Sequence, residues 1–425
     1  MEWLMIVIFV LGYVAIAFEH GIKINKAASA LITGVLCWTV YILSETDKDL
    51  VTSQLSEHLA TISGILFFLL GAMVIVELID AHDGFDLVTK RISTTDKRRL
   101  LWLTCIIAFF LSAILDNLTT TIVMVSLMRK IIEDREDRLL LVGMVVVSAN
   151  AGGAWSPLGD VTTTMLWIGG QISALNIVIM LFVPSLVCML VPLLVLSRKI
   201  KGKVKTPVLE NQNHLSSTTF ERNSVFGLGI GALLFVPIFK TVTHLPPYMG
   251  MLLGLGAMWV LTETIHSKKD EIEKGPRSVN HALRKIDTPS ILFFLGILVA
   301  VTALESVGTL HHLAEWLDHT VGNITAIGIL IGFLSAIVDN VPLVAAAQGM
   351  YDLKTYPPDS FFWELIAYCA GTGGSTLIIG SAAGVAAMGM ENINFFWYLK
   401  RISLLAIIGY LSGVAVYVAQ HALFP

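Results

Sequence analysis

The sequence predicts an all-α membrane protein with about ten transmembrane helices, and three observations lead to this fold class. Only 14% of the 425 residues are charged, whereas a soluble domain carries about 25%. The mean hydropathy is +0.76. The apolar residues also form long blocks, such as 4–18, 60–79, 100–128, 139–147, 172–196 and 403–418, and runs of about 20 apolar residues indicate membrane spans.

The first apolar block starts at Met1 without a basic segment or a small-residue cleavage site, so we expect a retained helix rather than a cleaved signal peptide. The four cysteines lie far apart in apolar segments, which predicts packing residues and no disulfide or metal framework. We predict no catalytic residues, no cofactor and no nucleic-acid partner. The expected partner of the chain is the lipid bilayer.

Basic residues concentrate in six patches, and basic loops lie predominantly on the cytoplasmic side of membrane proteins. The patches lie at 23–26, 90–99, 129–138, 198–205, 268–285 and 400–401. The segments 45–57, 244–248 and 305–318 are poor in Lys and Arg, and we place them outside. With this assignment, both termini are expected on the outer side.

The charges that flank residues 100–128 predict a re-entrant hairpin rather than a single crossing. This apolar stretch has a basic loop at each end, so both ends belong in the cytoplasm. The tip then falls at Asp116-Asn117, and irregular backbone at that depth must be buried in protein or line an aqueous cavity. The stretch 320–350, which holds Asp339-Asn340, has two flanks that look extracellular and predicts a second hairpin from the outside.

Three short segments of the first half recur in the second half at a nearly constant offset: 112–117 (SAILDN) with 335–340 (SAIVDN), 65–68 with 291–294, and 152–153 with 373–374. Together with the opposed hairpins, this predicts an inverted-topology repeat, which places ion sites near the midplane at discontinuous helices. The first repeat covers 1–199, with three spans, a cytoplasmic hairpin at about 100–128, a broken span at about 139–170 and a span at 172–197. A cytoplasmic linker, 200–224, leads to the inverted repeat 225–425, with a hairpin at about 320–350 and a broken span at about 361–391.

Each predicted broken span mixes glycine with polar residues. Gly and Pro interrupt helices and free carbonyl groups, and sodium binds oxygen ligands of this kind. Close helix packing is the alternative explanation for the glycines. The candidate ligands in the two segments are Asn150, Ser156, Asp160 and Thr163, and then Thr372, Ser375 and Thr376.

Three aspartates, Asp116, Asp160 and Asp339, lie within predicted membrane depth, where a charged Asp costs roughly 2.5–3.5 kcal/mol. A buried carboxyl group without a basic partner holds a proton unless a cation replaces it, which is the chemistry of an exchanger. The alternative is a protonated, purely structural residue. Glu77, Asp80 and Glu305 lie near span ends and are weaker candidates.

The Asp-Asn motifs, the segments 148–164 and 371–381, and the N-terminal segment 18–27 resemble the NhaD-type sodium/proton antiporters. The resemblance covers essentially the whole chain. It implies a homodimer with scaffold and transport domains and an elevator-type movement. Related sodium-coupled dicarboxylate transporters carry Ser-Asn-Thr at both hairpin tips, and this sequence departs from them there. Two aspartates would repel a dicarboxylate and hold a cation.

We therefore predict an antiporter of a bacterial inner membrane that exchanges cytoplasmic Na⁺, or Li⁺, for external H⁺. The candidate ligands are Asp116, Asn117, Asn150, Ser156, Asp160, Thr163, Asp339, Asn340, Thr372, Ser375 and Thr376. One alternative is a sodium-coupled anion or dicarboxylate transporter of the same superfamily. A second is an intramembrane enzyme with paired aspartates.

Overall fold

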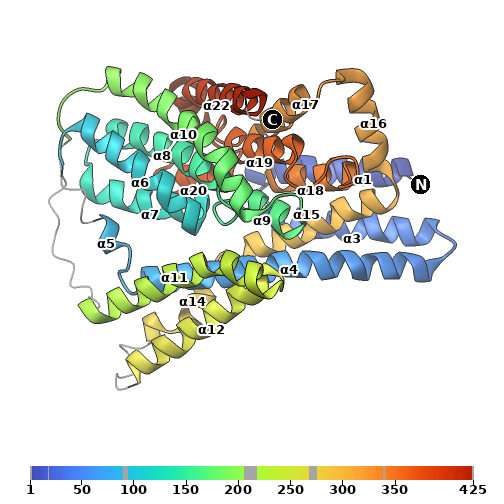
Figure 1. The fold of residues 1–425 in the computed structure, drawn as a ribbon, viewed down its shortest axis with the longest axis horizontal. Helices are drawn as coiled ribbons and strands as arrows, with labels where there is room; N and C mark the ends of the chain where they lie inside the picture. The colour runs from blue at the N-terminus through green and yellow to red at the C-terminus, as the bar shows by residue number, and fades with distance from the viewer. Residues whose placement is uncertain are drawn as a thin grey trace.

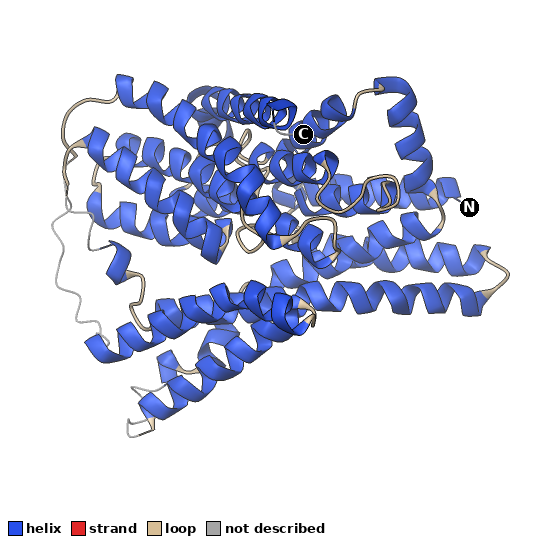
Figure 2. Cartoon of the chain, viewed as in Figure 1, coloured by secondary structure: helices blue, strands red, loops and turns tan. Residues whose placement is uncertain are grey.

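A computed structural model describes residues 2–17, 19–89, 94–204, 218–267, 275–337 and 340–423. The described residues are almost entirely helical and include no β-strand (Figure 2). The helices of the first half are α1 (Glu2–Ala17), α2 (Glu19–Ile22), α3 (Lys26–Ser44), α4 (Lys48–Ala81), α5 (Asp86–Thr89), α6 (Lys97–Leu115), α7 (Asn117–Ile131), α8 (Arg135–Ala154), α9 (Val161–Ile168) and α10 (Ala174–Lys199). Those of the second half are α11 (Thr219–Thr243), α12 (Pro247–His266), η1 (Gly275–Arg277), α14 (Val279–Lys285), α15 (Thr288–Ser306), α16 (Thr309–Val321), α17 (Ile324–Ile337), α18 (Asn340–Met350), α19 (Phe361–Gly373), α20 (Ala382–Glu391), α21 (Phe395–Tyr398), η2 (Leu399–Ser403) and α22 (Leu404–Leu423).

Nine helices of the described part are long and apolar enough to cross a membrane, and a tenth span results if the bent pair α16 and α17 counts as one. The two helices of that pair meet at 117°. Two further interruptions, at 155–160 between α8 and α9 and at 374–381 between α19 and α20, divide apolar segments. These features confirm the predicted all-α membrane fold class with about ten spans and broken helices.

Helix α4 shows that most of the segment 45–57 is helical and not a loop, whereas its placement outside stays a prediction. Residues 48–57 were expected in an external loop, but α4 begins at Lys48 and has 34 residues. At 1.5 Å per residue it is about 51 Å long, more than the roughly 30 Å of a bilayer core. Its first turn is stabilised by Asp47, whose Oδ1 accepts a hydrogen bond from Leu50 N (3.0 Å). Helix α16 likewise occupies most of the expected loop 305–318.

Helices α6 and α7 form a hairpin that turns at Asp116. Lys97 Nζ, at the start of α6, lies 2.5 Å from Asp137 Oδ2 at the start of α8. Only three residues separate the end of α7 at Ile131 from α8. The free end of α7 therefore lies beside the start of α6, whereas a straight continuation would separate the two ends by the length of both helices. In Figure 1, α6, α7 and α8 run side by side.

Helices α17 and α18 are arranged in the same way. Tyr351 directly follows α18, and its Oη donates to Asp318 Oδ1 (3.3 Å) in the last turns of α16. Because α17 begins only a few residues after α16, the end of α18 lies near the start of α17. Val338 and Asp339, which stand between the two helices in the sequence, lie outside the described residues.

Each hairpin packs against its broken helix through equivalent contacts. Ser112 Oγ donates to Ala149 O (2.6 Å), and the matching Ser335 Oγ donates to Ala370 O (3.0 Å). A Cβ atom on Gly152 would lie 2.1 Å from Phe109 O, and one on Gly373 would lie equally close to its own hairpin. The backbones approach so closely that only glycine fits. These paired contacts support the predicted repeat, although the assigned domain boundaries stay a prediction.

The two halves interlock rather than lie apart. Helix α3 packs against α15, α4 against α12, α7 against α20, and α10 against α22. The indole Nε1 of Trp38 on α3 donates to Val299 O on α15 (2.9 Å). At the far ends of α7 and α20, Glu391 accepts hydrogen bonds from Arg129 and Arg138. This interlocking brings polar side chains of the two halves together, such as Asn150 with Ser381 and Asn340 with Asp160.

Candidate cation site

The site forms where helices of both halves begin. Helices α7, α9 and α20 follow Asp116, Asp160 and Ser381, and each of these side chains caps its helix. Asp116 Oδ1 accepts from Thr119 N (2.7 Å), Asp160 Oδ1 from Thr162 N (2.8 Å), and Ser381 Oγ from the third residue of its own helix. Helix N-termini carry partial positive charge and attract anions. Here the protein supplies two carboxylates at these positions itself.

Asp160 is the centre of the cluster and is 1% exposed. Asn117 Nδ2, at the hairpin tip, donates to Asp160 Oδ2 (2.5 Å). Asn340 Nδ2, from the second repeat, lies 3.3 and 3.4 Å from the two carboxylate oxygens. Thr162 Oγ1 adds a hydrogen bond of 2.7 Å. A carboxylate from one broken helix thus binds amides from both hairpins, with donors that suit its ionised form.

Asn150 connects the cluster to the second broken helix. Its Oδ1 accepts from Asn117 Nδ2 (3.0 Å), and its Nδ2 donates to Ser381 Oγ (2.9 Å). Asn150 itself is fully buried on α8. Because Ser381 is the position equivalent to Asp160 in the repeat, Asn150 links the two equivalent helix caps.

Asp116 occupies a different environment from Asp160. It is half-buried, and its hydrogen bonds run to Thr119, with Thr119 N at 2.7 Å and Thr119 Oγ1 at 3.0 Å. Its φ of 106° lies in the region that non-glycine residues rarely adopt. Such strain persists only where the surroundings impose it, and it is concentrated at functional sites. The two carboxylates are near enough to interact electrostatically.

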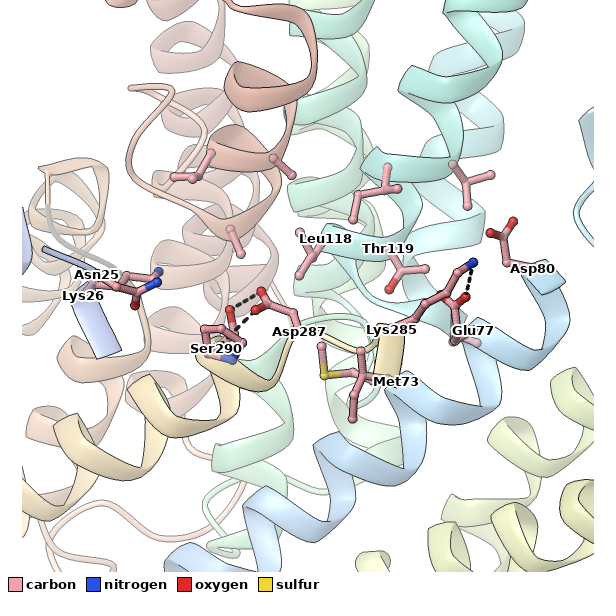
Figure 3. Close-up of a pocket in the computed structure, with 18 of the residues that line it drawn as sticks. Asn25, Lys26, Met73, Glu77, Asp80, Leu118, Thr119, Lys285, Asp287 and Ser290 are labelled. Atoms are coloured by element: carbon pink, nitrogen blue, oxygen red, sulfur yellow. Dashed lines mark hydrogen bonds and ion pairs between the residues drawn. The ribbon is translucent and has the colours of Figure 1, made fainter. Parts of the chain in front are cut away.

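A cavity of about 420 Å³ lies beside this site (Figure 3). Thr119, the partner of Asp116, lines it together with residues of α4, α7, α15 and α20. At its edge Lys285 Nζ lies 2.9 Å from Glu77 Oε1, and Asp287 accepts a hydrogen bond from Ser290. Asp80 also lines it (Figure 3). The weaker candidates Glu77 and Asp80 therefore line the same cavity as Thr119.

The predicted hydroxyl ligands form hydrogen bonds with main-chain oxygens rather than with the Asp160 carboxylate. The hydroxyl groups of Ser156, Thr163, Thr372, Ser375 and Thr376 all donate to main-chain carbonyl groups. Ser156 Oγ, for example, donates to Ala113 O (2.6 Å) and ties the interruption after α8 to α6. These residues stabilise the unwound segments, and their role as ligands stays a prediction. Asp339 lies outside the described residues.

Three residues absent from the predicted ligand set take part in the site: Thr119, Thr162 and Ser381. The threonines follow the aspartates by three and two residues, which is the spacing of helix N-cap partners. Ser381 could have been found from the repeat, because it is equivalent to Asp160. The described residues contain no group of three His, Cys, Asp or Glu side chains that could hold a metal ion. The cluster instead combines carboxylate, amide and hydroxyl groups, which suit a hard cation such as sodium.

Comparison with known proteins agrees with this architecture. Residues 13–371 match a family model described as "Citrate transporter". The chain is 51% identical to sodium/proton antiporter 1 of Arabidopsis thaliana, over 99% of the chain and 72% of the relative. It is 48% identical to sodium/proton antiporter 2 of the same plant, over 98% of the chain and 99% of the relative.

A bacterial protein also matches over almost the full length. The Na⁺/H⁺ antiporter NhaD of Alkalimonas amylolytica is 31% identical over 98% of this chain and 90% of its own. The family model and these relatives identify a multi-pass membrane transporter rather than an enzyme. The chain belongs to the NhaD-type sodium/proton antiporters within the citrate transporter family.

Proposed function

We propose that this protein exchanges Na⁺, or Li⁺, for H⁺ across a membrane, with both ions competing for the carboxyl group of Asp116 beside the fixed negative charge of Asp160. The observation that carries the proposal is the pair of aspartates that cap α7 and α9. Bare helix N-termini at the centre of a membrane protein favour an anion. Two carboxylates in front of these helix N-termini make the electrostatic potential of the site negative, and the site then favours a cation.

The contacts suggest different roles for the two aspartates. Asp160 is enclosed by donors from Thr162, Asn117 and Asn340, so it serves as the fixed negative centre. Asp116 is bound by Thr119, which lines the cavity, so its carboxyl group is the one that ions and protons reach. Rotation of the Asn117 amide would present its oxygen to a bound cation.

The position of the cavity suggests which side is open in this conformation. It is lined by Lys26 and Lys285, which belong to patches predicted to be cytoplasmic. We propose that this is the inward-open state and that the transport cycle moves α7, α9, α18 and α20 relative to α4, α11 and α15. An elevator-type movement and a homodimer are part of the proposal. Both plant and bacterial relatives match, so the bacterial inner membrane and the external termini stay predictions.

A sodium-coupled carboxylate transporter is the second candidate, because the matching family model is described as a citrate transporter. Its substrate would need a cationic or hydroxyl-lined pocket. The two aspartates in the described part of the site disfavour an anion.

The test is sodium-driven proton flux in proteoliposomes that contain a pH-sensitive dye. Asp116→Asn keeps the side-chain size and removes the exchangeable charge, so exchange should be abolished. Asp49→Asn, at an exposed position of α4, is the matched control and should exchange normally. Normal exchange by Asp116→Asn would exclude the proposed role of Asp116. Citrate or dicarboxylate uptake by the same vesicles, without sodium-driven proton flux, would support the second candidate.

A further inference from the structure

Lys240 lies in the last turn of α11, one turn from the end of a membrane-spanning helix. Lysines at such positions usually extend their ammonium group to the water interface. Here Lys240 is half-buried, and its Nζ donates a hydrogen bond of 2.9 Å to the main-chain oxygen of Trp167. The same Nζ lies 4.7 Å from the centre of the Trp167 ring. One side chain thus makes a charged hydrogen bond and a cation–π contact with the same residue.

Trp167 lies in the last turn of α9, the half-helix that begins after Asp160. The final carbonyl groups of a helix lack partners within the helix, and a cation near them is stabilised by the helix dipole. Helix α9 has eight residues and is about 12 Å long. Asp160 therefore binds its positive end and Lys240 its negative end.

The Trp167 side chain is held from a second direction as well. It is 2% exposed, and the centre of its ring lies 6.4 Å from the centre of the Phe68 ring on α4. The two rings are nearly perpendicular. Trp167 thus lies between α4 and α11, which pack against each other. The far end of α9 is fixed to these two helices, whereas its near end belongs to the ion site.

We propose that Lys240 is a positioning residue, which holds α9 against α4 and α11 in the conformation whose cavity reaches Thr119. This proposal rests on the proposed function, because it assigns Lys240 to a state of the transport cycle. When α9 moves relative to α11, the Lys240–Trp167 contact breaks and Phe68 becomes exposed. Lys240 acts on the ion site through α9 and does not bind the ion.

The experiment measures the reaction of a cysteine placed behind Trp167. Phe68→Cys is introduced into the full chain, where the four native cysteines are buried. Its labelling by N-ethylmaleimide reports how often α9 leaves α4. Lys240→Met keeps the length of the side chain but removes its charge and donors. The labelling rate should rise about fivefold, as expected for a lost helix-terminus contact of roughly 1 kcal/mol.

Two further variants separate positioning from general stability. Lys240→Arg retains a donor and a cation that binds an aromatic face, so labelling should stay at the level of the parent. Lys48→Met removes a lysine charge at an exposed position of α4 and should leave labelling unchanged. The proposal is overturned if Lys240→Met does not change Phe68→Cys labelling. It is equally overturned if the variant exposes the native cysteines to the same extent, which would indicate general loosening. Labelling requires no ion flux, so this result is independent of the Asp116→Asn exchange assay.

Discussion

At the scale of single residues, the two repeats are alike in their scaffolding and different in their chemistry. Ser112 and Ser335 make the same contact to the broken helices. Asp160, however, has Ser381 as its repeat equivalent, and Asn150 joins these two positions. The site is therefore asymmetric, with its described carboxylates on the first-repeat helices α7 and α9. In the proposed function, the transported ion is therefore assigned to the Asp116-Asn117 pair.

The glycines of the broken helices give a prediction at the same scale. Gly152→Ala should destabilise the protein by about 1–3 kcal/mol, because the added Cβ would lie 2.1 Å from Phe109 O and force the hairpin away from α8. Gly231→Ala on α11 is the control, since nothing lies within 4 Å of the added atom. The unfolding temperatures of the two detergent-solubilised variants are measured by thermal unfolding. Equal unfolding temperatures for the two variants would contradict the close approach of α6 and α8.

At the scale of elements, hairpins and half-helices place polar caps in an apolar interior. A continuous helix satisfies its own backbone and presents few polar groups. An interrupted helix creates a new N-terminus, and Asp116, Asp160 and Ser381 cap three such termini. Polar side chains that would be costly elsewhere are thereby stabilised, and hydrogen bonds through Asn117 and Asn150 join them.

The hairpin formed by α6 and α7 predicts the location of its two ends. Thr95→Cys, before α6, and Glu133→Cys, after α7, should react with a membrane-impermeant thiol reagent from the same side of the membrane. The Lys97–Asp137 ion pair is the structural reason, because it holds the starts of α6 and α8 together. Labelling of each cysteine is compared between intact right-side-out vesicles and inverted vesicles, which shows the side of the membrane on which the cysteine lies. Labelling from opposite sides would show that residues 97–131 cross the membrane.

At the scale of the whole molecule, the interlocked halves form a polar centre beside a cavity that Lys26, Lys285 and Thr119 line. The cavity lies between α7 and α20, which carry site residues, and α4 and α15. Helix α4 is long enough to extend well beyond the membrane core. A relative movement of these two groups of helices would close the cavity and change access to Asp116.

This arrangement predicts the side from which the cavity is reached. Ile122 lines the cavity on α7 and is 41% exposed. Ile122→Cys should therefore react with an impermeant reagent from the same side as Thr95→Cys, and saturating Na⁺ should slow the reaction if the bound ion holds α7. Leu175→Cys, an exposed position at the start of α10, is the control and should not respond to Na⁺. Reaction of Ile122→Cys from the opposite side would contradict the inward-open assignment.

Features that depend on local composition could be predicted from the sequence. Apolar blocks predicted the number of spans, loop charges predicted a hairpin at Asp116, and glycines interleaved with polar residues predicted the broken helices. Local composition misjudged α4, because polar residues such as those at 48–57 continue a helix as readily as they form a loop.

The contacts between polar side chains of different helices could not be predicted from the sequence and depend on how the helices pack. Asn117, Asn150 and Asn340 converge on Asp160, whereas the hydroxyl groups of Thr163, Thr372 and others bind nearby carbonyl groups. Lys240 pairs with Trp167, far from it in sequence. The direction of a buried side chain depends on how helices distant in sequence pack, and no local pattern contains that information. An unwound segment, in contrast, must satisfy its own backbone groups, and the nearest hydroxyl groups do so first.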